Sequence, residues 1–216
     1  MSDVSAMENR KLQELTDTLS KQPGHFNKTE IKCLIREFNE LLGKMSILGR
    51  PSIQGFDRER FKRILCSNFG IKDSIMMDEV FRTFDKDNDD FVTVKEWIEG
   101  LSVFLRGTLD EKIKYCFHVY DMNSDNYISR EEMLRMLKDG LPGLPTREER
   151  EEGIKELVEI TLKRMDHDHD GRLSLEDFEK SVKEENLLLE AFGKCLPEYK
   201  TIEKFEQDVF QKQVEQ

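Results

Sequence analysis

The chain has 216 residues, with 34 Lys and Arg against 45 Asp and Glu, so its formal net charge is −11. An acidic surface repels phosphate groups, and we therefore expect no nucleic-acid partner. No apolar run approaches the roughly 18–20 residues of a membrane-spanning helix. The start has no signal peptide, and Ser2 stands where N-myristoylation requires glycine. With four cysteines and no CxxC pair, the sequence predicts a cytoplasmic protein with reduced thiols and no membrane anchor.

The predicted elements begin with an amphipathic helix within residues 1–26, whose apolar face carries leucines at helical spacing. A second helix begins after Asn27, because this N-cap residue is followed three positions later by Glu30, as in a capping box. The charge then changes along the chain. Residues 1–72 carry 13 basic and 9 acidic side chains, whereas residues 73–216 carry 21 and 36.

The acidic residues gather in three bursts of one pattern, at residues 85–96, 121–132 and 166–177. Each burst has oxygen-bearing side chains at positions 1, 3 and 5, an apolar residue at position 8 and a carboxylate at position 12. This is the spacing of the EF-hand calcium loop. Ca²⁺ prefers about six to eight oxygen ligands, which alternate side chains and the backbone carbonyl of position 7 supply. The predicted ligands are Asp85, Asp87, Asp89, Phe91 and Glu96 in the first loop, Asp121, Asn123, Asp125, Tyr127 and Glu132 in the second, and Asp166, Asp168, Asp170, Arg172 and Asp177 in the third.

Other interpretations of these bursts explain less. A polar surface loop or the carboxylate pair of a glycoside hydrolase accounts for one burst, but not for three repeats in one register. His167 and His169 raise the alternative of zinc, yet they hold outward-facing loop positions, so we expect solvent around them. We expect up to three bound Ca²⁺ ions. We expect no enzymatic activity, because no nucleophile–base pair, phosphate loop or cofactor motif occurs.

Two loop positions depart from the common pattern. Position 6 is usually glycine because the chain turns there with positive φ, but it is Asp90 in the first loop and Asn126 in the second. Asp and Asn tolerate this conformation at a cost on the order of 1 kcal/mol, so both loops should still bind. Position 12 of the third loop is Asp177, one methylene shorter than glutamate. The shorter reach predicts weaker calcium binding there, or Mg²⁺ at rest.

A degenerate unit precedes the three loops. Residues 49–60 align with the later loops, with Phe56 at position 8 but Gly49, Pro51 and Ile53 at ligand positions and Arg60 at position 12. Arginine there would repel a cation, so we interpret this unit as an EF-hand that kept its packing and lost its metal.

Apolar residues at helical spacing flank every loop, which predicts an all-α, two-lobed protein with four helix–loop–helix units. The lobes span residues 27–105 and 109–183, between an N-terminal amphipathic helix at 1–26 and a C-terminal helical extension at 184–216. A Gly- and Pro-containing break at residues 140–145 interrupts the second lobe.

Pairing of the loops predicts two short ribbons, one that joins Phe56 to Val92 and one that joins Ile128 to Leu173.

Cysteines and methionines also carry expectations. Cys33 and Cys116 lie in apolar stripes and should be buried, whereas Cys195, beyond the last loop, is the cysteine that we expect to be exposed. Methionines at helical spacing are more often core, although an opening calcium sensor can also present them to a partner. These are Met76, Met77, Met133, Met136 and Met165.

Four EF-hands with a degenerate first one, followed by an apolar helix, resemble the neuronal calcium sensor class. The stretches that carry the resemblance are Phe84–Asp89, Leu101–Gly107, Asp166–Gly171 and Leu187–Gly193, and the likeness extends to about Pro197. Within this class the sequence is most similar to an axonemal calcium sensor. The resemblance implies calcium-dependent regulation of the outer-arm dynein heavy chain and its docking complex, in the axoneme of cilia and flagella.

The residues themselves leave three functions open: a calcium sensor that regulates a protein target, a calcium buffer, and a regulatory subunit of an enzyme, such as a calcineurin B-like protein. Buffer EF-hands barely open on binding calcium and have little use for apolar helices at both ends, which favours the sensor.

Overall fold

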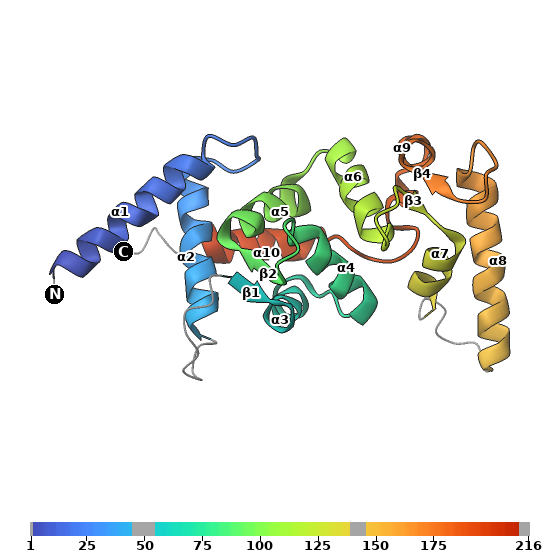
Figure 1. Cartoon of the computed structure of the whole chain (residues 1–216), viewed down its shortest axis with the longest axis horizontal. Coiled ribbons are helices and arrows are strands. Elements are labelled where there is room, and N and C mark those ends of the chain that lie inside the picture. Colours follow the sequence, from blue (N-terminus) through green and yellow to red (C-terminus); the bar gives the residue numbers. More distant parts are fainter. Residues whose placement is uncertain (1, 45–54, 139–145, 212–216) are drawn as a thin grey trace. The chain divides into compact units, whose positions relative to one another are not determined.

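The computed structural model of the protein describes residues 2–44, 55–138 and 146–211, and helices make up most of these ranges (Figure 1). This confirms the all-α fold class. Residues 140–145, where we expected a break, and positions 1–6 of the loop at 49–60 lie outside the described residues. The helices are α1 (Ser2–Leu19), α2 (Lys28–Lys44), α3 (Arg58–Phe69), α4 (Ser74–Phe84), α5 (Val94–Arg106), α6 (Leu109–Tyr120), α7 (Arg130–Leu137), α8 (Arg147–Met165), α9 (Leu175–Glu184), the 3₁₀ helix η1 (Asn186–Glu190) and α10 (Tyr199–Phe210).

The chain divides into two compact units. The first unit contains residues 1–70, 84–107 and 197–216, and the second contains residues 71–83 and 108–196. The four-part division that we expected from the sequence stays a prediction. No helix within the described ranges is long and apolar enough to cross a bilayer.

The first unit is built around a short ribbon and a cluster of aromatic rings. Strand β1 (Gly55–Asp57) pairs antiparallel with β2 (Phe91–Thr93), and Phe56 lies opposite Val92, as predicted. The ring of Phe56 meets the fully buried Trp97 edge-on, with 5.4 Å between the centroids. Gly100 lets α5 approach this cluster, because a Cβ there would lie 2.3 Å from the ring of Phe84. Packing of this density makes the ribbon a fixed frame for the adjoining loop.

The C-terminal helix α10 completes the first unit. Phe205 of α10 is buried, and its ring lies 5.0 Å from that of Phe69. Arg106 joins the same helix to α2, because its Nε donates to Glu206 at 2.7 Å and its Nη2 donates to Glu30 at 2.8 Å. Charge-assisted hydrogen bonds of this kind are stronger than neutral ones, so they reinforce the apolar contact.

The second unit repeats the ribbon. Strand β3 (Tyr127–Ile128) pairs antiparallel with β4 (Leu173–Ser174), and Ile128 lies opposite Leu173, which confirms the second predicted pair. Tyr120 is fully buried between α9 and the segment that follows η1, with its ring centroid 5.3 Å from that of Phe192. Its hydroxyl donates to the backbone carbonyl of Gly193 at 2.7 Å.

One cysteine prediction is wrong. Cys195 is fully buried, because the segment after η1 folds back over α6 and brings its Sγ to 3.4 Å from Sγ of Cys116. Burial and this neighbour both raise the pKa of the Cys116 thiol. The predictions for Cys33 and Cys116 are confirmed, since both are buried, and Cys66 is the exposed cysteine.

The methionine prediction holds for most of the set. Met76, Met133, Met136 and Met165 are buried in the core, whereas Met77 is only half-buried.

Candidate metal centres

The three predicted loops share one framework, in which the side chain of position 1 ties the turn together. Its carboxylate is buried in each loop and accepts the backbone N–H groups of positions 5 and 6. The donors to Asp85 are Asp89 N at 3.2 Å and Asp90 N at 3.0 Å; those to Asp121 are Asp125 N at 3.1 Å and Asn126 N at 2.9 Å; those to Asp166 are Asp170 N at 3.2 Å and Gly171 N at 2.9 Å. The loops are therefore shaped by hydrogen bonds of their own.

The backbone of each loop turns through the left-handed region at positions 4 and 6. At position 6, φ is 66° for Asp90, 69° for Asn126 and 86° for Gly171. This confirms that position 6 needs a positive φ in all three loops, with Asp and Asn in place of glycine in the first two. Position 4 has the same conformation, with φ of 57° for Asn88, 58° for Ser124 and 62° for His169. This second positive φ was not predicted from the sequence.

Position 12 joins each loop to the helix that follows. Glu96 is the N3 residue of α5, where it forms a capping box with Thr93, and Glu132 does the same with Ser129 at the start of α7. The other oxygen of each carboxylate reaches back across the loop. Oε1 of Glu96 accepts Lys86 N at 2.9 Å, and Oε1 of Glu132 accepts Met122 N at 2.8 Å. Each closing glutamate thus contacts both the start of its loop and the first turn of the exiting helix.

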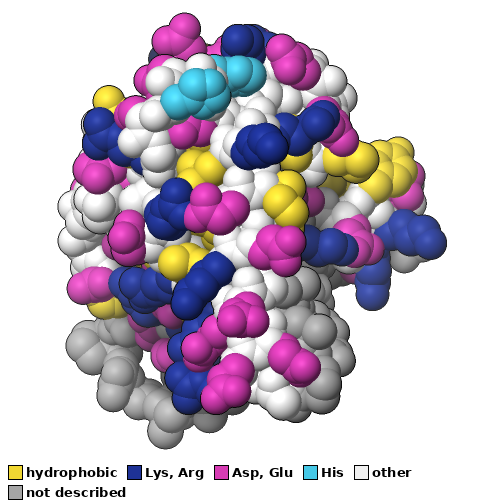
Figure 2. All heavy atoms as spheres, turned by 90° about the vertical axis from the view of Figure 1, so that its right-hand side faces the viewer, with side chains coloured by type: hydrophobic (Ala, Val, Ile, Leu, Met, Phe, Trp, Pro, Cys, Tyr) yellow, Lys and Arg dark blue, Asp and Glu magenta, His cyan; other side chains and the backbone are white. Residues whose placement is uncertain are grey.

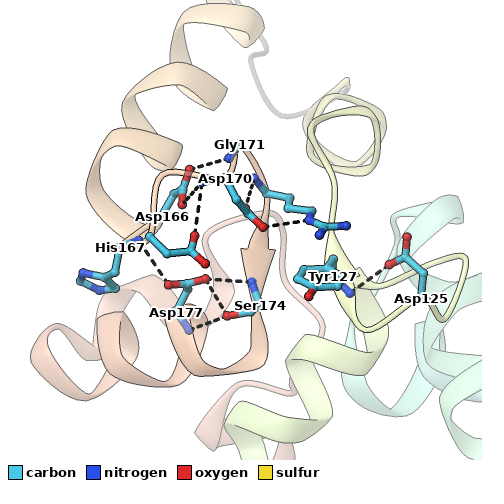
Figure 3. Close-up of polar contacts among 10 residues, drawn as sticks. Asp125, Tyr127, Asp166, His167, Asp170, Gly171, Ser174 and Asp177 are labelled. Atoms are coloured by element: carbon cyan, nitrogen blue, oxygen red, sulfur yellow. Dashed lines mark hydrogen bonds and ion pairs between the residues drawn. The ribbon is translucent and has the colours of Figure 1, made fainter.

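Asp177 makes the same two connections in the third loop (Figure 3). Its Oδ2 accepts Ser174 N at 3.1 Å and the Ser174 hydroxyl at 2.6 Å, and its Oδ1 accepts His167 N at 3.2 Å. Carboxylate oxygens of Asp166, Asp168 and Asp177 lie within 4.8 Å of one another. The exiting helix α9 therefore brings the shorter side chain into the loop.

The predicted side-chain ligands come together to different degrees. In the first loop, Asp85, Asp87 and Asp89 also offer oxygens within 4.8 Å of one another. In the second loop Asn123 is the neutral member, and its Nδ2 donates to Asp125 at 3.0 Å. Both acidic groups found among the described residues consist of aspartates alone, and such hard oxygen donors suit Ca²⁺ or Mg²⁺.

The position-7 residues, which we expected to contribute backbone carbonyls, lie at the ribbons. Phe91 begins β2, Tyr127 begins β3, and Arg172 immediately precedes β4. Carbonyl coordination by these residues stays a prediction.

The position-1 carboxylates differ in their electrostatics. Burial raises the pKa of Asp85 and of Asp121 above the usual range of an aspartate. Burial also opposes ionisation of Asp166, but the hydrogen bonds that it accepts, led by that from Gly171 N, outweigh this effect and lower its pKa. In the first two loops, a buried negative charge is therefore left for a cation to compensate.

The histidines of the third loop differ from one another. His169 is exposed, as expected, but His167 is partly buried, and its Nε2 lies 3.1 Å from the Ser181 hydroxyl. Neither histidine belongs to the acidic groups that the described residues form.

In the degenerate unit, Asp57 caps α3 by accepting Arg60 N at 2.8 Å. Arg60 thus holds the helix position that Glu96 holds in α5, while the loop's first half lies outside the described residues. The capping pattern that joins position 9 to position 12 was missed from the sequence, although a Ser or Thr three residues before an acidic residue is a known signal. The side chain of Arg172 was also missed, because only its carbonyl was considered.

The loops, ribbons and paired helices define an EF-hand protein, and a family model described as an EF-hand domain pair matches residues 110–183. The chain is 61% identical to calaxin of Danio rerio over 205 residues, which cover 94% of this chain and 97% of that protein. It is 57% identical to calaxin of Homo sapiens over 204 residues, which cover 94% of this chain and 96% of the relative. The chain belongs to the calaxin family. These relatives and the EF-hand pair support a calcium-sensor protein, and EF-hand domains imply Ca²⁺ binding.

Proposed function

We propose that this chain is a calcium sensor that changes conformation on binding Ca²⁺ and thereby regulates a protein target. The proposed ligands are the fifteen residues identified from the loop spacing. The observation that carries the proposal is the double connection of the closing carboxylate, which contacts the loop start and the capping box of the exiting helix at once. A movement of this carboxylate therefore moves the helix on which it stands.

The second loop illustrates the proposed coupling. Oε1 of Glu132 accepts Met122 N at 2.8 Å, and Oε2 accepts Ser129 N at 2.7 Å. Glu132 would hold a bound Ca²⁺ through its carboxylate oxygens, and the ion would supply a positive charge for them. Exchange of these N–H partners for the ion would shift the first turn of α7. That helix also carries the buried Met133 and Met136, so its movement would alter the apolar core.

The described surface exposes few large hydrophobic side chains. The face in Figure 2 carries interspersed basic and acidic side chains, with hydrophobic side chains in small separate groups. The exposed large hydrophobic residues of the described chain are Leu109, Ile160, Leu187 and Tyr199. Fluorescence of a hydrophobic dye measures the exposure of further apolar surface. For a sensor, calcium should increase dye fluorescence; an unchanged signal at saturating calcium would favour the calcium buffer instead.

The stoichiometry tests the ligand set. We expect at most three Ca²⁺ per chain by calorimetry, with Mg²⁺ possible in the last loop. A fourth site that survives substitution of Asp85, Asp121 and Asp166 together would contradict the degenerate first EF-hand.

For the target, we propose the outer-arm dynein heavy chain and its docking complex, with the protein located in the axoneme of cilia or flagella. The support is membership of the calaxin family together with the resemblance of the sequence to an axonemal calcium sensor. Purified protein should bind isolated outer-arm dynein with its docking complex differently at micromolar calcium and in chelator. A variant with Glu96→Gln and Glu132→Gln is the matched control, because it should lose the calcium dependence while keeping the fold.

The competing function is a regulatory subunit of an enzyme. Binding to a phosphatase catalytic subunit from non-ciliated tissue, without binding to dynein, would favour it over the proposed target.

A further inference from the structure

The side chain of Arg172 makes contacts that its place in the loop does not require. Arg172 holds position 7 of the third loop, next to the proposed ligand Asp170. Its backbone N donates to Oδ1 of Asp170 at 3.0 Å, and its Nε donates to Oδ2 of the same carboxylate at 2.9 Å. A single residue thus engages both oxygens of a proposed metal ligand.

The guanidinium of Arg172 also reaches the neighbouring loop. Its Cζ lies 3.5 Å from the centroid of the Tyr127 ring, well inside the distance at which a cation and an aromatic face attract. Figure 3 shows Asp170 and Tyr127 close together, although they come from different loops. The ribbon fixes this arrangement, because Tyr127 and Ser174 are paired residues of β3 and β4. Tyr127 therefore provides a platform that holds the guanidinium beside Asp170.

The other two loops lack this cation at position 7, where they carry Phe91 and Tyr127. Their position-5 carboxylates also accept the N–H of position 7, from Phe91 to Asp89 at 2.8 Å and from Tyr127 to Asp125 at 2.9 Å. The backbone contact is thus common to the three loops, and the guanidinium contact is an addition in the third.

We propose that Arg172 is an internal counter-cation, seated on Tyr127, that competes with a divalent ion for Asp170 and lowers the metal affinity of the last loop. The inference rests on the proposed ligand set. Arginine keeps its charge at any physiological pH, so the competition is permanent. Ca²⁺ and Mg²⁺ carry the same charge, and the guanidinium repels both equally. Selectivity between them depends on ligand number and cavity size, which Arg172 does not alter.

The test uses the full chain with Glu96→Gln and Glu132→Gln, so that the last loop dominates the titration. In this background Arg172→Gln should raise the affinities for Ca²⁺ and for Mg²⁺ by the same factor, on the order of tenfold, measured by calorimetry. Tyr127→Leu removes the platform and should give a smaller rise for both ions.

Arg147→Gln is the matched control. It removes the same charge from the same unit and likewise breaks an exposed ion pair, with Glu151. Arg147 lies at the other end of α8, roughly 28 Å from the loop, so its loss should leave both affinities unchanged.

A second readout needs no metal. In the metal-free protein, the side-chain protons of Arg172 should show upfield ring-current shifts in NMR spectra, retained in Tyr127→Phe and lost in Tyr127→Leu. The proposal is overturned if Arg172→Gln leaves both affinities unchanged, lowers them, or raises the affinity for only one ion. The proposed ligand set would remain intact in each case. A last loop that binds neither ion, with or without Arg172, would overturn both.

Discussion

The two loops closed by glutamate, at 85–96 and 121–132, differ from the loop closed by aspartate, at 166–177, in how the last residue reaches the loop start. The contact from the closing carboxylate to the backbone N of position 2 is 2.9 Å for Glu96, 2.8 Å for Glu132 and 3.2 Å for Asp177. Asp177 is shorter by a methylene, yet it makes the same capping box with its helix. Reach therefore depends on the placement of the exiting helix as well as on side-chain length.

The two kinds of loop also differ in the charge of their ligands and in the backbone at position 6. The third loop has four aspartates among its proposed ligands and a glycine at position 6, both of which favour a cation, but it also has Arg172 against Asp170. Of the glutamate-closed loops, the first also has four acidic ligands and the second has three; neither has glycine at position 6, but both have a longer closing side chain. We therefore expect the two kinds of loop to differ in selectivity more than in structure.

The largest effect should come from the closing glutamates. Glu96→Gln or Glu132→Gln keeps the side-chain volume but removes the charge and one good ligand, so the calcium affinity of that loop should fall by at least about tenfold. The calcium-induced change in Trp97 fluorescence or circular dichroism should be lost with it.

The control is Glu149→Gln, which makes the same change in the capping box of α8 outside any loop. It should cost only about 1 kcal/mol of stability and leave calcium binding intact. If both loop variants keep the full calcium response, these glutamates are not the trigger.

The next effect concerns Asp177. A carboxylate that gives one oxygen in place of two penalises Ca²⁺, with its six to eight ligands, more than Mg²⁺, which prefers six. Asp177→Glu should therefore raise the calcium affinity of the last loop, and its preference over Mg²⁺, by roughly tenfold. Calorimetry with and without millimolar magnesium measures both quantities.

The rival possibility is that α9 already lies close enough for full coordination, as the contact from Asp177 to His167 N suggests. In that case the wild-type loop is the tightest site, and Asp177→Glu overfills it and weakens binding. That outcome would show the argument from reach to be wrong.

A smaller effect is expected at position 6. Asn126→Gly should stabilise the metal-free protein by about 0.5–1 kcal/mol, because glycine adopts a φ of 69° without the steric cost of a side chain. Gly171→Asn should destabilise the metal-free protein by a similar free energy. Apart from Gly171 itself and its two chain neighbours, no heavy atom lies within 4 Å of a Cβ built at this position, so the loss would come from the backbone alone. Urea unfolding in chelator measures both changes in stability. If both variants are as stable as the wild type, the loops do not differ in backbone strain at position 6.

Much of the fold was predictable because loop spacing and helical period repeat along the chain. The pairs Phe56–Val92 and Ile128–Leu173 followed from aligning position 8 of neighbouring loops, and both are confirmed. Positive φ at position 6 followed from the residue types that tolerate it.

Contacts between distant segments were not predictable in this way. The burial of Cys195 depends on the segment after η1 folding over α6. The two cysteines are 79 positions apart in the sequence, and no local pattern predicts such a contact. The Arg172–Tyr127 contact was missed for a related reason. It depends on side chains of two loops that only the ribbon brings together.

The smallest effect that we expect is a difference in pH dependence between the second and third loops. Burial raises the pKa of Asp121, whereas hydrogen bonds, against the effect of burial, lower that of Asp166. A raised folded-state pKa means that the folded metal-free protein binds the proton more tightly than the unfolded chain. The stability from Asp121 is then present below its unfolded pKa, about 3.9, and is lost as pH rises through its folded pKa. For Asp166 the stability is present above about 3.9 and is lost as pH falls through the lowered value.

Asn replaces each group with a side chain that does not titrate, so the comparison isolates one carboxyl. As pH falls from 7 to 3, metal-free wild type should gain stability relative to Asp121→Asn and lose stability relative to Asp166→Asn. Urea unfolding in chelator at several pH values measures the two differences, and two slopes of the same sign would contradict the opposite electrostatics of the position-1 carboxylates. Slopes of opposite sign would show that folding favours the protonated carboxyl of Asp121 and the ionised carboxyl of Asp166.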